Sequence, residues 1–312
     1  MAWYALQEIE EAAKRTRELL LPFDWKLWAK IAVMAFFVGG VAFPGASPGG
    51  SFSDSDDFDA GQDIISGSDI GQSGIYGFST AAIILIALAA AIGIGLVFGL
   101  LKAVFSFVYY QSLLDDEIRI RENFRKHLFN GLHLFTFEIA VIIAFIAAAG
   151  LLVLPLAITP LSLIVTLPLA VVFVIAAVVF FQFTADFIPL FMIEKEQGVI
   201  ASWRDLYQVA IDEWRQLGLY FVVKMVIGLM VQIAIGTASL LFVLLLIIPV
   251  GLLAFVMYLI FKPLALVAVL IGLLIWVGGI VYFLNGPAVT FFRYYSLLVY
   301  NDLTQAENVE KE

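Results

Sequence analysis

The chain contains apolar runs that are too long for the core of a soluble domain. Three of them are Ala81–Leu101, Ile139–Leu156 and Leu217–Val250, and each holds at most one isolated charged residue. A helix needs roughly 20 such residues to cross about 30 Å of hydrocarbon. A transmembrane strand would alternate apolar and polar residues, and these runs do not. The sequence therefore predicts an all-α, polytopic helical membrane protein.

The composition agrees, because 62% of the residues are hydrophobic and 14% are charged. A soluble surface requires more charge than this. The stretch between Pro249 and Pro263 is too short to cross a bilayer, which favours a re-entrant or interfacial piece, although it could also belong to a long helix. We expect about six transmembrane helices, at 28–45, 79–113, 134–157, 161–192, 217–248 and 264–299.

The distribution of Lys and Arg predicts the orientation. Most of these residues lie in the first 30 positions and in the loops 115–131 and 194–216, whereas the loop 44–78 contains none. Loops rich in Lys and Arg face the cytoplasm in most membrane proteins. We therefore expect a multi-pass protein of the cell membrane with both termini in the cytoplasm.

Three parts of the chain resemble one another. Each begins with a charged amphipathic stretch, followed by a shorter and then a longer apolar span, and the best match is between Ala103–Leu114 and Ala288–Leu298. The pattern predicts three parallel-repeat hairpins in a single membrane domain, each preceded by a cytoplasmic amphipathic helix. The expected parts are an N-terminal amphipathic helix 1–27, hairpins 28–114, 115–193 and 194–302, and a cytoplasmic tail 303–312.

The stretch Ile200–Leu217 is an amphipathic segment between two of these apolar runs. Trp203, Tyr207 and Trp214 recur at spacings of roughly one or two helical turns, which places them on one apolar face. Aromatic side chains of this kind lie at the depth of lipid headgroups. We expect these three residues to form an interface with lipid or with a protein partner.

Several short motifs carry a resemblance to known proteins: Met1–Leu6, Leu21–Trp28, Phe36–Gly40, Trp203–Arg204 and Phe292–Tyr295. They resemble those of a family of unknown function among archaeal, mainly haloarchaeal, multi-pass membrane proteins. More distantly, the chain is similar to the six-helix membrane domain that precedes some bacterial glycerophosphodiester phosphodiesterases. The resemblance implies a fold and a lineage but no activity.

Four charged residues inside the apolar spans are the main candidates for a functional role. Glu138 and Lys224 occupy matched positions of two repeats, and Asp186 and Arg293 occupy another matched pair. The opposite signs predict the pairs Glu138–Lys224 and Asp186–Arg293, since an unpaired charge in hydrocarbon is costly. The pairs could be structural clasps, or they could line a vestibule or relay a proton.

The acidic, Gly- and Ser-rich outer loop 44–78 offers a weak calcium candidate. Its carboxylates lie at short spacing but without the EF-hand pattern, so a solvated loop suited to a saline environment is the alternative. His127 and His133 lack a third ligand, which favours interfacial histidines over a metal site. The four candidate calcium ligands are Asp54, Asp56, Asp57 and Asp59.

No catalytic motif occurs in the sequence. It contains no cysteine, no phosphate-binding loop, no HExxH and no nucleophile elbow, so we expect neither an enzyme nor a cofactor. The basic loops carry too few charges for nucleic-acid binding. We expect a non-catalytic membrane module that organises lipid or a partner through cytoplasmic amphipathic helices. The alternative is a small transporter or channel for an ion or a lipid-like solute.

Overall fold

The computed structural model describes residues 4–39, 80–115, 117–154, 163–260 and 262–311, and these ranges are helical apart from short connections. They contain no strand, as the unbroken apolar runs predict. The helices are α1 (Tyr4–Leu20), α2 (Trp25–Gly39), α4 (Thr80–Leu114), α5 (Ile120–Val153), α6 (Leu163–Glu194), α7 (Val199–Asp212), α8 (Trp214–Ile260), α9 (Lys262–Gly279), the π-helix η5 (Ile280–Asn285) and α10 (Gly286–Lys311).

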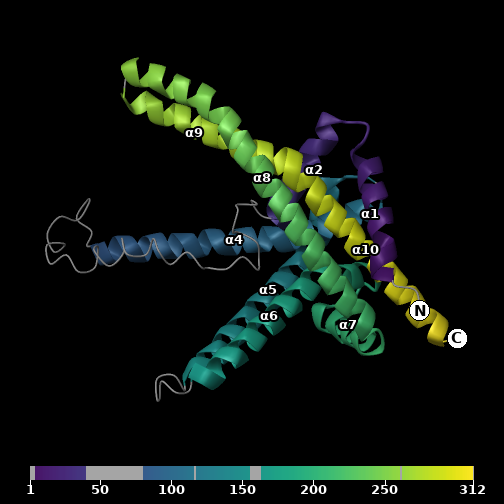
Figure 1. The fold of residues 1–312 in the computed structure, drawn as a ribbon. Helices are drawn as coiled ribbons and strands as arrows, with labels where there is room; N and C mark the ends of the chain where they lie inside the picture. The colour runs from purple at the N-terminus through teal and green to yellow at the C-terminus, as the bar shows by residue number, and fades with distance from the viewer. Residues whose placement is uncertain (1–3, 40–79, 116, 155–162, 261, 312) are drawn as a thin grey trace.

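The helices converge on one head, from which three arms diverge (Figure 1). The first arm is the N-terminal part of α4, the second consists of α5 beside α6, and the third of α8 beside α9. The head contains α1, α2 and α7 together with α10 and the adjoining ends of α4, α5, α6 and α8. In the following text, "arms" means residues 80–99, 139–153 with 163–179, and 225–279.

The buried core of the protein lies in the head. It is formed mainly by residues 103–113 of α4, 187–192 of α6 and 294–303 of α10, with contributions from α1, α2, α5, α7 and α8. Aromatic side chains form a large part of it, and the rings of Tyr220 and Tyr295 stack with centroids 5.3 Å apart. The largest side chains that are buried almost completely are Tyr109, Tyr110, Tyr220, Tyr295, Phe107, Phe187 and Phe191.

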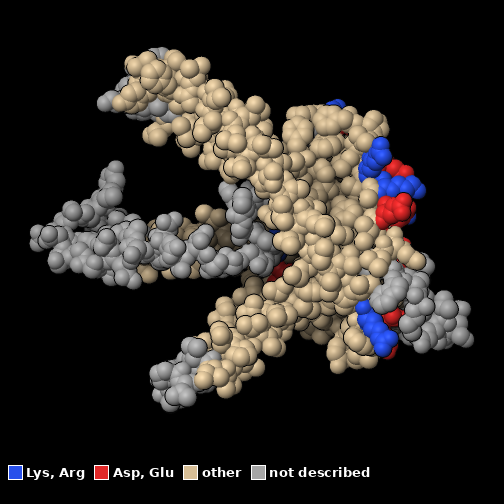
Figure 2. All heavy atoms as spheres, in the orientation of Figure 1, with Lys and Arg blue, Asp and Glu red and all other residues tan. Residues whose placement is uncertain are grey.

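The arms expose apolar side chains along their length. Every residue of α4 from Ile84 to Phe98 is exposed, so this part of the helix has no buried face. In Figure 2, Lys, Arg, Asp and Glu gather on the head, and the visible parts of the arms are formed by other residues. Such surface is stable in contact with lipid and unstable in contact with water.

Glycines allow two pairs of helices to approach closely. A Cβ atom at Gly131 of α5 would lie 2.7 Å from the Cα atom of Val104 in α4, so only glycine fits at this crossing. In the third arm, a Cβ at Gly272 would lie 2.7 Å from Val250, and one at Gly279 would lie 2.8 Å from Phe242. The glycines therefore position α4 against α5 and α9 against α8.

Four helices are long and apolar enough to cross a membrane: Ile84–Leu114, Ile120–Val153, Ile164–Glu194 and Trp214–Leu259. They correspond to four of the six predicted spans. The first predicted span is represented by the 15-residue helix α2, which stops at the edge of the described residues. The sixth is divided among α9, η5 and α10, and its long apolar stretch Leu266–Trp276 is shorter than a span. The six-span prediction therefore stays a prediction.

Two finer expectations were wrong. The stretch after Pro249 is not a re-entrant piece, because α8 continues through this proline to Ile260. A proline removes one backbone donor, and the apolar side chains on both sides favour the continued helix in lipid. The segment 115–131 is not a separate interfacial helix either, since α5 runs without a break from Ile120 to Val153. The outer loop 44–78 lies outside the described residues.

Candidate functional site

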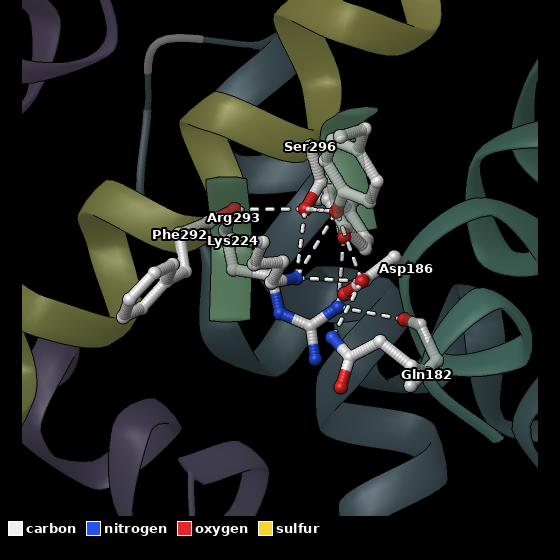
Figure 3. A network of polar contacts seen from close by, with 9 residues as sticks. Gln182, Asp186, Lys224, Phe292, Arg293 and Ser296 are labelled. Atoms are coloured by element: carbon white, nitrogen blue, oxygen red, sulfur yellow. Dashed lines mark hydrogen bonds and ion pairs between the residues drawn. The ribbon is translucent and has the colours of Figure 1, made fainter. Parts of the chain in front are cut away.

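A network of polar side chains lies where the three arms leave the head (Figure 3). We call it the arm-junction network, and it joins α4, α6, α8 and α10. Helical spacing brings its members together, because Gln182 and Asp186, and likewise Tyr220 and Lys224, are four residues apart on one face. The members are Tyr110, Gln182, Asp186, Tyr220, Lys224, Arg293 and Ser296.

The centre of the network is an ion pair between α6 and α8. The Lys224 ammonium donates to Oδ2 of Asp186 at 2.6 Å, and both side chains are largely buried. Lys224 also donates to the Tyr220 hydroxyl at 3.1 Å and to Oγ of Ser296 at 3.2 Å. These three contacts match the three donors of an ammonium group. Asp186 accepts further bonds from Gln182 at 2.7 Å and Tyr220 at 2.9 Å.

Arg293 of α10 connects the network to the first arm. Its Nη1 group donates to the Tyr110 hydroxyl of α4 at 2.8 Å and to the backbone oxygen of Ala185 in α6 at 2.8 Å. The guanidinium also lies over the Tyr110 ring, 4.7 Å from its centroid. Close by, the hydroxyls of Tyr109 and Thr290 are 2.7 Å apart and form a second bond between α4 and α10.

The four charged residues singled out in the sequence are brought together only in part. Asp186, Lys224 and Arg293 meet, but Lys224 pairs with Asp186 and not with Glu138, and no ion pair within 4.0 Å joins Asp186 to Arg293. Glu138 of α5 has Lys102 of α4 as its charged neighbour. The predicted pairs assumed exact repeat symmetry, whereas in the structure Lys102, and not Lys224, is the cation that acts on Glu138.

The three predicted interface aromatics have two different environments. Tyr207 and Trp214 are 63% and 64% exposed, so both are free to contact lipid or a partner. Trp203 points the other way and stacks on Phe180 of α6, with ring centroids 4.4 Å apart. The helix α7 buries Ser202, Leu206 and Val209, and Trp203 lies on the margin of that face.

The two histidines considered as metal ligands, His127 and His133, are not members of this network. Asp54, Asp56, Asp57 and Asp59 lie outside the described residues. His127 is buried, stacks on Phe107 and lies 3.2 Å from Gln111 through its Nε2 atom. His133 is exposed. Among the described residues, no three His, Cys, Asp or Glu side chains come together as metal ligands.

Sequence reasoning missed the hydroxyl groups of the network. Tyr110, Tyr220 and Ser296 supply three of its hydrogen-bonding groups, and all three are almost completely buried. The repeated Tyr-Tyr dipeptides at 109–110 and 294–295 were the available signal, because a tyrosine deep in an apolar helix needs a partner for its hydroxyl. A tyrosine without a repeat counterpart, such as Tyr220, could be identified only from the structure.

A carboxyl pair joins the two ends of the chain at the outer side of the head. Glu8 of α1 interacts with Asp302 of α10, and Glu11 and Arg15 are the other charged groups that affect Glu8. Burial raises the pKa of both carboxyls above their ordinary values of 4.5 and 3.8, and the Asp302 charge raises the pKa of Glu8 further. Folding therefore favours the protonated forms of both carboxyls relative to the unfolded chain.

This pair predicts a pH dependence for the packing of α1 on α10. The stability that it contributes is complete below about pH 3.8 and is lost as the pH rises through the two raised pKa values. We expect Glu8→Gln to raise the thermal unfolding temperature at pH 7 and to leave it unchanged at pH 3.5. Thermal unfolding in detergent over this range is the measurement, and Glu10→Gln at an exposed position of α1 is the control.

Four long apolar helices, three of which are joined by a buried polar network, define the class of the protein: it is a helical membrane protein. A family model covers residues 3–308 of the chain, and its description is a family of unknown function, DUF7544. The chain therefore belongs to this family. No curated protein and no solved structure matches it.

Proposed function

We propose that the protein is a non-catalytic membrane module that organises lipid around three separated arms. One observation carries the proposal: residues Ile84 to Phe98 of α4 are exposed on every side of the helix. The apolar windows of α5 and α8 likewise contain no buried residue. Transmembrane helices that serve a transport path pack against one another, whereas these arms leave room for acyl chains between them.

The proposal includes the finer topology. We infer six transmembrane helices in three parallel repeats, with α2 and the α9–α10 run completing the four long spans. Both termini and the exposed aromatics Tyr207 and Trp214 lie on the cytoplasmic side of the cell membrane, and the charged surface of the head supports this orientation (Figure 2). An archaeal lineage and a distant similarity to the membrane domain of the glycerophosphodiester phosphodiesterases are part of the same proposal.

Spin labelling in lipid vesicles tests the proposal. The chain has no cysteine, so each single-cysteine variant carries one label. Labels placed successively at positions 84–98 of α4 are expected to show uniformly high accessibility to oxygen and low accessibility to a water-soluble nickel chelate. The reason is that lipid surrounds a helix that has no protein-facing side.

Residues 123–134 of α5, with Gly131 left unlabelled, provide the control, because Asn123, His127 and Leu134 are buried at helical spacing. Oxygen accessibility there is expected to oscillate with a period of about 3.6 residues. The same oscillation along positions 84–98 would show that another arm, a second copy or a partner covers one face of α4. That result would overturn the proposal in favour of a packed helical bundle.

A small transporter or channel is the second candidate, and η5 favours it. A π-helix within a longer helical run often marks a functional position, and η5 ends at the buried Asn285 beside Gly286 and Pro287. Flux through proteoliposomes separates the two candidates when native protein is compared with Asn285→Leu. Flux that native protein supports and this variant loses would favour the transporter.

A further inference from the structure

The arm-junction network lies at the depth expected for lipid phosphate groups in the proposed topology. From Thr80 to Lys102, α4 extends roughly 33 Å, and from Leu163 to Asp186, α6 extends roughly 35 Å, at about 1.5 Å per residue. Both lengths match the roughly 30 Å of a hydrocarbon core. The charged residues at the base of these arms therefore lie at the cytoplasmic boundary of that core.

The network carries more positive than negative charge. Lys224 and Arg293 are two cations, and Asp186 is the one carboxylate among its members. Arg293 is 7% exposed, and the Lys224 side chain is 13% exposed. The network is therefore one negative charge short of neutrality. An uncompensated charge with so little access to water is costly in free energy.

The unused hydrogen-bonding capacity lies on Arg293. All three donors of Lys224 are taken by Asp186, Tyr220 and Ser296. Both hydrogen bonds of Arg293 come from Nη1, and within the described residues its Nε and Nη2 groups donate to no oxygen (Figure 3). This edge of a guanidinium presents two parallel donors, which is the geometry that binds carboxylate or phosphate oxygens.

We propose that Arg293 binds a singly charged phosphate group, the phosphodiester of an anionic phospholipid, at the junction of the three arms. One phosphodiester supplies the one missing negative charge, and two of its oxygens match the free Nε–Nη2 edge. The inference rests on the proposed function, because it names the lipid class that the arms organise. A soluble phosphate compound has the same chemistry and is the other source to be tested.

The competing arrangement is a closed clasp. Oδ1 of Asp186 accepts no hydrogen bond from the described residues. The hydrogen bonds that this carboxylate accepts from Gln182, Tyr220 and Lys224 all end on Oδ2. A turn of the Arg293 side chain toward Oδ1 would use the free edge without any ligand. The experiment must therefore separate a bound phosphate from a rearranged ion pair.

The test uses the delipidated full chain in a neutral detergent, titrated with dioleoyl phosphatidylglycerol and followed by native mass spectrometry and thermal unfolding. We expect one tightly bound lipid per chain, and at least roughly tenfold weaker binding in Arg293→Lys, because lysine keeps the charge but loses the paired donors. Dioleoyl phosphatidylcholine, which has no net charge, is expected to bind weakly to both proteins. Arg125→Gln, at an exposed position of α5, is the matched control and should bind like the native chain.

Four outcomes decide between the arrangements. Equal lipid affinity of native protein and Arg293→Lys supports the clasp and overturns the site, as does an equal loss in Arg125→Gln. Inorganic phosphate that stabilises the native chain and displaces the lipid keeps the phosphate site but assigns it to a soluble compound. Stabilisation by the lipid alone assigns it to the membrane.

A measurement on the native protein covers the case in which Arg293→Lys does not fold. A buried contact is screened little by salt, so the tightly bound lipid should remain at 1 M sodium chloride, whereas lipid held by exposed charges dissociates. Complete loss at 1 M salt overturns the proposal. Uniform oxygen accessibility along α4 together with no lipid selectivity would reject this site alone, while oscillating accessibility would reject the proposed function.

Discussion

Lys224→Met is expected to lower the free energy of unfolding by about 3–5 kcal/mol, because it removes the cation that forms an ion pair with the buried Asp186 carboxylate. Asp186 and Lys224 are joined at 2.6 Å, and their side chains are 4% and 13% exposed. The double variant Asp186→Asn with Lys224→Met should recover part of this loss, since neither partner of the ion pair then remains and Arg293 is the one charge left in the network. Reversible unfolding in mixed detergent micelles measures all three variants.

The control is the more exposed pair Lys195–Asp205, which is 2.7 Å apart and has side-chain exposures of 42% and 25%. Lys195→Met should cost less than about 1 kcal/mol, because solvent screens an exposed pair. Additive losses in the Asp186 and Lys224 double variant would show that the two residues act independently. The clasp between α6 and α8 would then be rejected.

Gly131→Ala is expected to cost about 1–3 kcal/mol or more, although it adds a single methyl group. The new Cβ would lie 2.7 Å from the Cα and 2.9 Å from the backbone nitrogen of Val104, so α4 and α5 must move apart. The base of the first arm moves with them. Thermal unfolding and the oxygen accessibility of labels on α4 would record the change.

Gly150→Ala is the matched control on the same helix. A Cβ at Gly150 meets no atom within 4 Å, so the substitution changes the stability only through the higher helix propensity of alanine. We expect it to be neutral or to stabilise the protein by up to about 1 kcal/mol. Equal effects of the two substitutions would show that α4 and α5 do not cross closely at Gly131.

The helical membrane class could be predicted from the sequence because it depends on local properties. An apolar run such as Ala81–Leu101 requires a helix in lipid whatever its neighbours are, and the structure has a long helix there. The end of α8 could not be predicted, since Pro249 resembles a helix terminator in isolation. Whether a helix continues through a proline depends on the environment of the helix, which here is apolar on both sides of Pro249.

The candidate site was predictable by residue type but not by pairing. The cost of a charge in hydrocarbon pointed to Asp186, Lys224 and Arg293, and these three residues do meet. Their partners depend on how the helices cross, and that is set by contacts such as Gly131 on Val104. A symmetry argument from the repeats gives each charge an equivalent position, but equivalent positions need not be neighbours.

The length of α8 has a consequence for how copies of the protein share a membrane. From Lys224 to Ile260 the helix extends roughly 54 Å, nearly twice the thickness of a hydrocarbon core, and no charged residue interrupts it. In the proposed orientation the third arm must lean, so that its tip lies roughly 45 Å to the side of its base. Each molecule therefore occupies a small area of the inner leaflet and spans a much larger area of the outer leaflet. The lateral reach of the arms then sets the spacing between neighbouring copies. As the protein becomes crowded, neighbouring copies will meet in the outer leaflet before they meet in the inner one.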